Sequence, residues 1–166
     1  ERALYWTDIR APALFRLDTR SGEVERWSMP ELAGSVVLRG SGGVIVGLQS
    51  GLYSFHPGTQ PLDRYLEFPG RHPDDRTNDA RCDRQGRLWF TRMRDFGKAS
   101  TGGLYRLDAS GDPVELISGV TIPNAICFSP DGQRFYFADT PKDSLDAFEM
   151  TGTGPSFHRL GAVIPP

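Results

Sequence analysis

Short apolar runs alternate with clusters of glycine, proline and polar residues along the whole chain. Apolar runs of this length, bounded by turn-forming residues, are typical of β-strands, and no segment predicts a helix of useful length. The sequence therefore predicts an all-β protein with many short strands joined by tight turns.

The apolar runs form a unit that recurs four times. It consists of an apolar strand, a second strand with the pattern Leu-(Tyr/Phe)-x-(Leu/Phe), and a third strand in which polar and apolar residues are mixed. The copies begin at Leu4, Val44, Leu88 and Phe135, at successive offsets of 40, 44 and 47 residues. This spacing is typical of the four-stranded blades of a β-propeller. We expect strands at residues 4–8, 14–18, 24–27, 44–47, 52–55, 62–66, 88–91, 104–108, 114–117, 135–139, 145–148 and 157–160.

A further strand is predicted ahead of the second, third and fourth copies, at residues 35–38, 78–82 and 124–128. Because such a strand opens its blade, it is expected to be the innermost one and to line the central channel. The first copy has no such strand. We therefore expect one propeller domain over residues 1–166, incomplete at both ends, with about four antiparallel blades.

Composition and charge narrow the possible partners. The 166 residues, 38% hydrophobic, can bury a substantial core, and the 19 basic and 21 acidic residues give a net charge of −2. With so small a net charge, long-range electrostatic attraction would not draw the protein to nucleic acid or to an anionic membrane. A small or neutral partner is therefore expected. No transmembrane run or signal peptide is evident, which makes the cytoplasm the expected location.

The remaining residue types suggest structural roles. Cys82 and Cys127 are the only cysteines, so we expect two reduced, buried thiols. Four aspartates that close strands are expected to form turns, and four arginines are expected to cover outer blade surfaces with their aliphatic stems. These residues are Asp8, Asp18, Asp108 and Asp139, and Arg16, Arg26, Arg64 and Arg106.

Two segments place polar groups where the repeat favours apolar ones. A charged loop at residues 71–79 runs into an inner strand, and Asn124 interrupts an apolar stretch. Asn78 and Asn124 head inner strands of adjacent blades, so they are expected to face the same end of the channel. Taken singly, each asparagine could instead be a turn former that bonds its own backbone.

The strings RTNDARCDRQGRLW (residues 76–89) and IPNAICFSPDG (residues 122–132) resemble the two central signatures of a known family. This is the senescence-marker-protein/gluconolactonase/luciferin-regenerating-enzyme-like, or regucalcin-like, family, and residues 4–9 resemble its first blade. The resemblance implies a six-bladed propeller and a divalent-metal-dependent hydrolase that opens a sugar lactone in the channel.

The resemblance also implies roles for individual residues. Asn124 would bind one divalent cation, which could be Ca²⁺, Zn²⁺, Mn²⁺, Mg²⁺ or Fe²⁺, while Arg76 and Asn78 would hold the lactone. An amide oxygen is a hard neutral ligand, and a guanidinium is a good partner for hydroxyl and carbonyl oxygens. The cation would polarise the lactone carbonyl for attack by water, and a carboxylate would take the proton.

The sequence also departs from the family pattern. By the resemblance, a metal-binding Glu would precede Glu1, and a metal-binding Asp that is also the general base would follow Pro166. No catalytic residue is therefore assigned within residues 1–166. We expect the chain alone to be inactive. Arg92 stands where the family has a small residue, which suggests an acidic sugar lactone. A propeller that binds without catalysis is the alternative, and a phosphoester substrate is a third possibility.

Overall fold

A computed structural model describes residues 2–59, 61–108, 111–151 and 157–164. In these ranges the chain forms short strands and two single-turn 3₁₀ helices, η1 (Asp95–Gly97) and η2 (Thr140–Lys142). Neither is long and apolar enough to cross a membrane, and the described ranges hold no other helix. The strands are β1 (Ala3–Asp8), β2 (Ala13–Asp18), β3 (Val24–Ser28), β4 (Ser35–Leu38), β5 (Val44–Gly47), β6 (Gly51–Phe55), β7 (Asp63–Glu67), β8 (Asp75–Cys82), β9 (Leu88–Arg94), β10 (Gly102–Leu107), β11 (Pro113–Val120), β12 (Pro123–Phe128), β13 (Arg134–Asp139), β14 (Leu145–Met150) and β15 (Phe157–Ile164).

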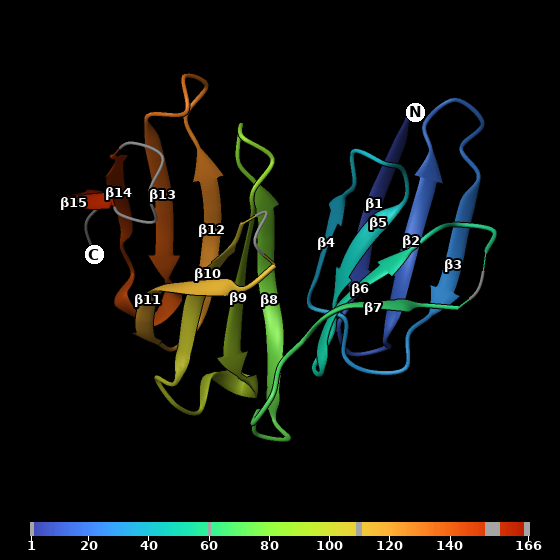
Figure 1. Cartoon of the computed structure of the whole chain (residues 1–166), viewed down its shortest axis with the longest axis horizontal. Coiled ribbons are helices and arrows are strands. Elements are labelled where there is room, and N and C mark those ends of the chain that lie inside the picture. Colours follow the sequence, from blue (N-terminus) through green and yellow to red (C-terminus); the bar gives the residue numbers. More distant parts are fainter. Residues whose placement is uncertain (1, 60, 109–110, 152–156, 165–166) are drawn as a thin grey trace. The chain divides into compact units, whose positions relative to one another are not determined.

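The strands form four sheets in which each strand pairs with the next one along the chain (Figure 1). The first sheet has three strands, β1 to β3, and the other three have four: β4 to β7, β8 to β11 and β12 to β15. This is the meander of successive β-propeller blades. Every predicted strand is confirmed, with differences only at strand ends, as is the missing opening strand of the first copy.

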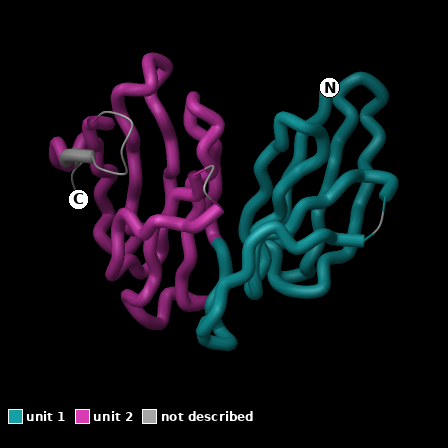
Figure 2. The backbone as a smooth tube through the Cα atoms, viewed as in Figure 1, with its two compact units in different colours: residues 1–77 teal, residues 78–166 magenta. Residues whose placement is uncertain are grey.

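The chain divides into two compact units (Figure 2). The N-terminal unit comprises residues 1–77 and the C-terminal unit residues 78–166, so the boundary falls inside β8. Each unit has its own apolar cluster, to which both of its sheets contribute. The clusters consist of Leu14, Met29, Ala33, Val44, Val46, Leu48 and Phe55 in the first unit, and of Trp89, Leu104, Val120, Ile126, Phe135, Phe137 and Phe148 in the second.

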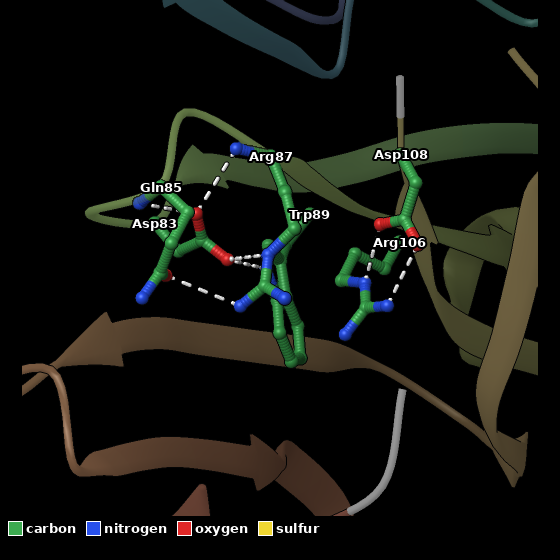
Figure 3. Close-up of polar contacts among 6 residues, drawn as sticks. All are labelled: Asp83, Gln85, Arg87, Trp89, Arg106 and Asp108. Carbon is green, nitrogen blue, oxygen red and sulfur yellow. Dashed lines mark hydrogen bonds and ion pairs between the residues drawn. The ribbon is translucent and has the colours of Figure 1, made fainter. Parts of the chain in front are cut away.

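A buried carboxylate holds the turn between β8 and β9 (Figure 3). Asp83 accepts hydrogen bonds from Nε of Arg87 at 2.6 Å and from Nε1 of Trp89 at 2.9 Å. It also accepts the backbone N–H groups of Gln85 and Arg87, each at 3.0 Å. The turn is therefore tied directly to the largest side chain of the C-terminal core.

Arg106 is buried, which contradicts its predicted place on an outer surface. It is 1% exposed, and its guanidinium carbon lies 5.8 Å from the centroid of the Trp89 ring. Nε and Nη2 donate to the two oxygens of Asp108 at 2.7 and 2.8 Å (Figure 3). A cation–π contact and a bidentate partner make the burial of this charge tolerable. The hydrogen bonds from Arg106 lower the pKa of Asp108.

The two cysteines are unbonded, as predicted, but the prediction that they are buried is wrong. Both are exposed and line an open cleft of about 250 Å³ in the C-terminal unit. Cys82 is the last residue of β8, and Cys127 lies near the end of β12. Both strands lie at an edge of their sheets, so one side of each has no neighbouring strand of its own sheet.

Replacing Asp83 by alanine should lower the free energy of unfolding of the C-terminal unit by about 3 kcal/mol, because Arg87 and Trp89 would lose a buried acceptor. Urea denaturation followed by tryptophan fluorescence measures the change. Glu67→Ala is the control, since it removes only an exposed ion pair with Arg64 (3.1 Å), and it should leave the midpoint unchanged. Equal losses in both variants would contradict this role for Asp83.

Both thiols should react with a thiol reagent such as DTNB in the native chain, because both are exposed. Partial burial, with a smaller contribution from the charge of Asp83, raises the pKa of Cys82. Less of Cys82 is therefore thiolate at a given pH, and in the Cys127→Ser variant it should react more slowly than a cysteine in a short peptide. Its rate should still increase at pH values where the peptide rate has levelled off. A Cys82 that is as fast as the peptide would contradict this expectation.

Candidate functional site

The only two asparagines of the chain meet in the C-terminal unit. Asn78 lies in β8 and Asn124 in β12, the edge strands of neighbouring blades in chain order. Nδ2 of Asn78 donates to Oδ1 of Asn124 at 2.8 Å and to the carbonyl oxygen of Pro123 at 2.7 Å. These hydrogen bonds join two strands. They show that the two side chains lie together, whereas a local turn former would bond its own backbone. That both face the same end of a channel stays a prediction.

The amide of Asn124 is held from both sides. Its oxygen accepts from Asn78, and its Nδ2 donates to Oγ1 of Thr140 at 2.8 Å. Thr140 opens η2, and its backbone N–H donates to the carbonyl oxygen of Ile122 at 3.0 Å. Since an amide oxygen carries two lone pairs, one hydrogen bond from Asn78 is compatible with a second interaction in a fixed direction.

A β-bulge follows Asn124 directly. Asn124 pairs with Ala138 and Cys127 with Tyr136, so that Ala125 and Ile126 together oppose one residue of β13. Ala125 has a φ of 61°, in the left-handed region that residues other than glycine rarely enter. The site residue Asn124 is therefore next to the most unusual backbone of its strand.

Arg76 lies two residues before Asn78 in β8 and is described within the N-terminal unit. It is 7% exposed, and its Nη1 donates to the carbonyl oxygen of Thr77 at 2.9 Å. Thr77 is fully buried and donates from Oγ1 to the carbonyl oxygen of Gly47 at 2.7 Å. The structure thus brings Asn78 and Asn124 together, and it anchors Arg76 within its own unit.

Several residues around the asparagines carry no signal in the sequence. Thr140 contacts Asn124 directly, and the hydroxyl of Thr91 bonds the backbone of Asp79, the residue after Asn78. Asp139 was expected to form a turn after its own strand, but its Oδ1 accepts the N–H groups of Thr121 and Ile122 at 3.1 and 2.9 Å. No spacing in the sequence signals these contacts, because each one joins segments that are 12 to 18 residues apart.

Comparison with known proteins identifies the family. A sequence model of the SMP-30/Gluconolactonase/LRE-like region matches residues 1–163. The chain belongs to this family. It is 36% identical over 154 residues to 6-deoxy-6-sulfogluconolactonase of Pseudomonas putida, covering 93% of this chain and 53% of that protein. It is also 36% identical over 144 residues to L-arabinolactonase of Azospirillum brasilense, covering 84% of this chain and 47% of that protein.

The fold of this SMP-30/gluconolactonase/LRE-like chain is also that of solved structures. It superimposes on a calcium-binding protein, regucalcin of Agrobacterium tumefaciens strain C58, with a TM-score of 0.86 and 26% identity. The superposition covers 98% of this chain and 55% of that one. The chain thus spans about half the length of these relatives.

The donors of this family member fit part of a cation site. Within residues 2–59, 61–108, 111–151 and 157–164, no group of three or more His, Cys, Asp or Glu side chains is placed to hold a metal ion. The oriented amide oxygen of Asn124 is suited to one coordination position of a hard divalent cation. The described residues therefore offer one fixed ligand, and a cation bound there would need others.

Proposed function

We propose that this chain is part of a divalent-cation-dependent lactonase that opens a sugar lactone. The observation that carries the proposal is the hydrogen-bonded pair of Asn78 and Asn124, which presents an amide oxygen in a fixed direction. The similarity to two proteins named as sugar lactonases supports the reaction class. We further propose that residues 1–166 form one incomplete domain of a six-bladed propeller, whose metal-binding carboxylates lie outside this chain.

In this proposal each site residue has a separate task. Asn124 is one ligand of the cation, which polarises the lactone carbonyl when it is bound. Asn78 orients Asn124 through its Nδ2, whose two hydrogens go to Asn124 and Pro123. Its Oδ1 accepts a hydrogen bond from a lactone hydroxyl, while Arg76 donates to the lactone oxygens. A carboxylate outside this chain takes the proton of the attacking water. The hard amide donor favours Ca²⁺, Mg²⁺ or Mn²⁺ over softer metals.

We also propose that the lactone carries a negative charge. Arg92 is half-buried in β9, a strand that is hydrogen-bonded to β8, which carries Asn78. A guanidinium near the site would bind a carboxylate or sulfonate of the substrate by charge-assisted hydrogen bonds. The name of the relative from Pseudomonas putida indicates a sulfonated sugar lactone as the substrate of that protein, which supports this choice.

The main test compares the 166-residue chain with the same chain extended by its flanking coding sequence. The extended protein should bind Mn²⁺ or Ca²⁺ and open gluconolactone, measured by proton release. The short chain should bind the cation weakly, because one neutral amide supplies too few ligands. It should show no activity, because the proton acceptor, which contributes about 10²–10⁴-fold in rate, lies outside the short chain. Activity in the short chain would refute the assignment of the carboxylates.

In the extended protein, Asn124→Ala should weaken cation binding and lower the rate, each by about 100-fold, because a directed ligand is lost. Gln133→Ala is the matched control, since it removes an exposed amide of the same hairpin. It should leave both quantities unchanged. An extended protein that binds lactone and cation without opening the ring would instead identify a binding module.

Arg92→Gln should raise KM for an anionic lactone, such as the sulfonated gluconolactone, by about tenfold, because a charge-assisted hydrogen bond is lost. KM for the neutral gluconolactone should change little. Arg84→Gln, which removes an exposed arginine from the turn after β8, is the control for net charge. Equal changes of KM for both lactones would refute a direct contact between Arg92 and the substrate charge.

A further inference from the structure

The backbone around Asn124 is fixed by a carboxylate that has no role in the proposed chemistry. Oδ2 of Asp79 accepts the backbone N–H of Ile126 at 3.0 Å, so that β8 holds β12 at the bulge. We propose that Asp79 is a positioning residue, which keeps the bulge of β12 in place and thereby directs the side chain of Asn124. The proposal rests on the proposed function in one respect, that Asn124 is the cation ligand.

The bulge resolves a conflict between the core and the site. In a regular strand, residues 124 and 126 would share one face. Ile126 is 2% exposed and belongs to the apolar cluster, whereas Asn124 must stay at the open edge. The extra residue lets Asn124 and Cys127 share the face of Ala138 and Tyr136, while Ile126 turns into the core.

The bulge has two costs that Asp79 can offset. Ala125 is held at a φ of 61°, where its Cβ makes unfavourable contacts with the backbone. The shift of register also takes the N–H of Ile126 out of the regular pairing with β13. A carboxylate oxygen is a strong acceptor for that N–H, and it stabilises only the bulged conformation.

Asp79 is itself held in place. The hydroxyl of Thr91, which is fully buried in β9, donates to the carbonyl oxygen of Asp79 at 3.1 Å and accepts its N–H at 2.8 Å. On the other side of Asn124, the carboxylate of Asp139 accepts the N–H groups of Thr121 and Ile122. The segment that carries Asn124 is thus fixed by one carboxylate before it and by Asp79 after it.

The composition of the chain makes a direct test possible. Because Asn78 and Asn124 are the only asparagines, a ¹⁵N-asparagine-labelled sample of the 166-residue chain gives one side-chain amide signal pair for each. In the unmodified chain, both pairs should lie away from random-coil positions and show a nuclear Overhauser effect to each other. In Asp79→Ala this effect should disappear, and the Asn124 pair should move to random-coil positions.

Two further variants separate positioning from general destabilisation. Asp131→Ala removes a carboxylate that likewise accepts a backbone N–H, that of Gln133 at 3.0 Å, in the turn after β12. It should leave both asparagine signals in place. Ala125→Gly lets the backbone adopt a positive φ without the steric cost, so in the Asp79→Ala background it should restore the Asn124 signals at least in part. Asparagine signals unchanged in Asp79→Ala, or lost equally in Asp131→Ala, would overturn the proposal.

The extended protein links this inference to the cation. There Asp79→Ala should weaken Mn²⁺ binding by about 10- to 100-fold, as is usual for residues that orient a ligand, and Ala125→Gly should recover part of it. If Asp79→Ala binds Mn²⁺ as tightly as the unmodified protein, the positioning role is refuted and the lactonase proposal stands. If no variant binds any cation while the asparagine signals respond as expected, the lactonase proposal fails and Asp79 remains the residue that directs Asn124.

Discussion

In each unit, two sheets bury their apolar faces in one common core, and the rest of the structure depends on this constraint. A single meander of three or four strands cannot cover both of its faces, so each sheet needs a neighbour. In the C-terminal unit, Trp89 and Phe135 from the two sheets meet with ring centroids 5.1 Å apart. Because the sheet faces are used for the core, polar side chains can be placed at the sheet edges, where β8 and β12 carry the two asparagines.

That constraint explains why the edge of β12 is irregular. A strand that contributes Ile126 to the core cannot also direct Asn124 outward while it alternates regularly. The chain meets both demands by inserting one residue, and the irregular backbone is then fixed by Asp79 through the N–H of Ile126. Bulges next to functional residues are common for this reason, since they redirect one side chain without disturbing the sheet behind it.

Charged groups inside the C-terminal unit follow the same logic. Asp83 and Arg106 both contact Trp89, one through the indole N–H and the other over the ring. Each is compensated by an oppositely charged partner, Arg87 or Asp108 respectively. Asp83 holds the turn between β8 and β9, and Arg106 and Asp108 lie at the end of β10 (Figure 3). These charges therefore stabilise the sheet whose strand β8 carries Asn78.

The sequence by itself determined the number, order and approximate bounds of the strands, because apolar periodicity and turn residues are local signals. It also singled out Asn78 and Asn124, since two polar residues at equivalent places of a repeat are visible without coordinates. It failed for Arg106 and for the exposure of Cys82 and Cys127, because burial depends on which face of a strand meets another sheet. Only the tertiary structure showed the bulge at Ala125 and the contacts of Asp79, Thr91 and Thr140, because these join strands that are distant in sequence and leave no periodic trace in it.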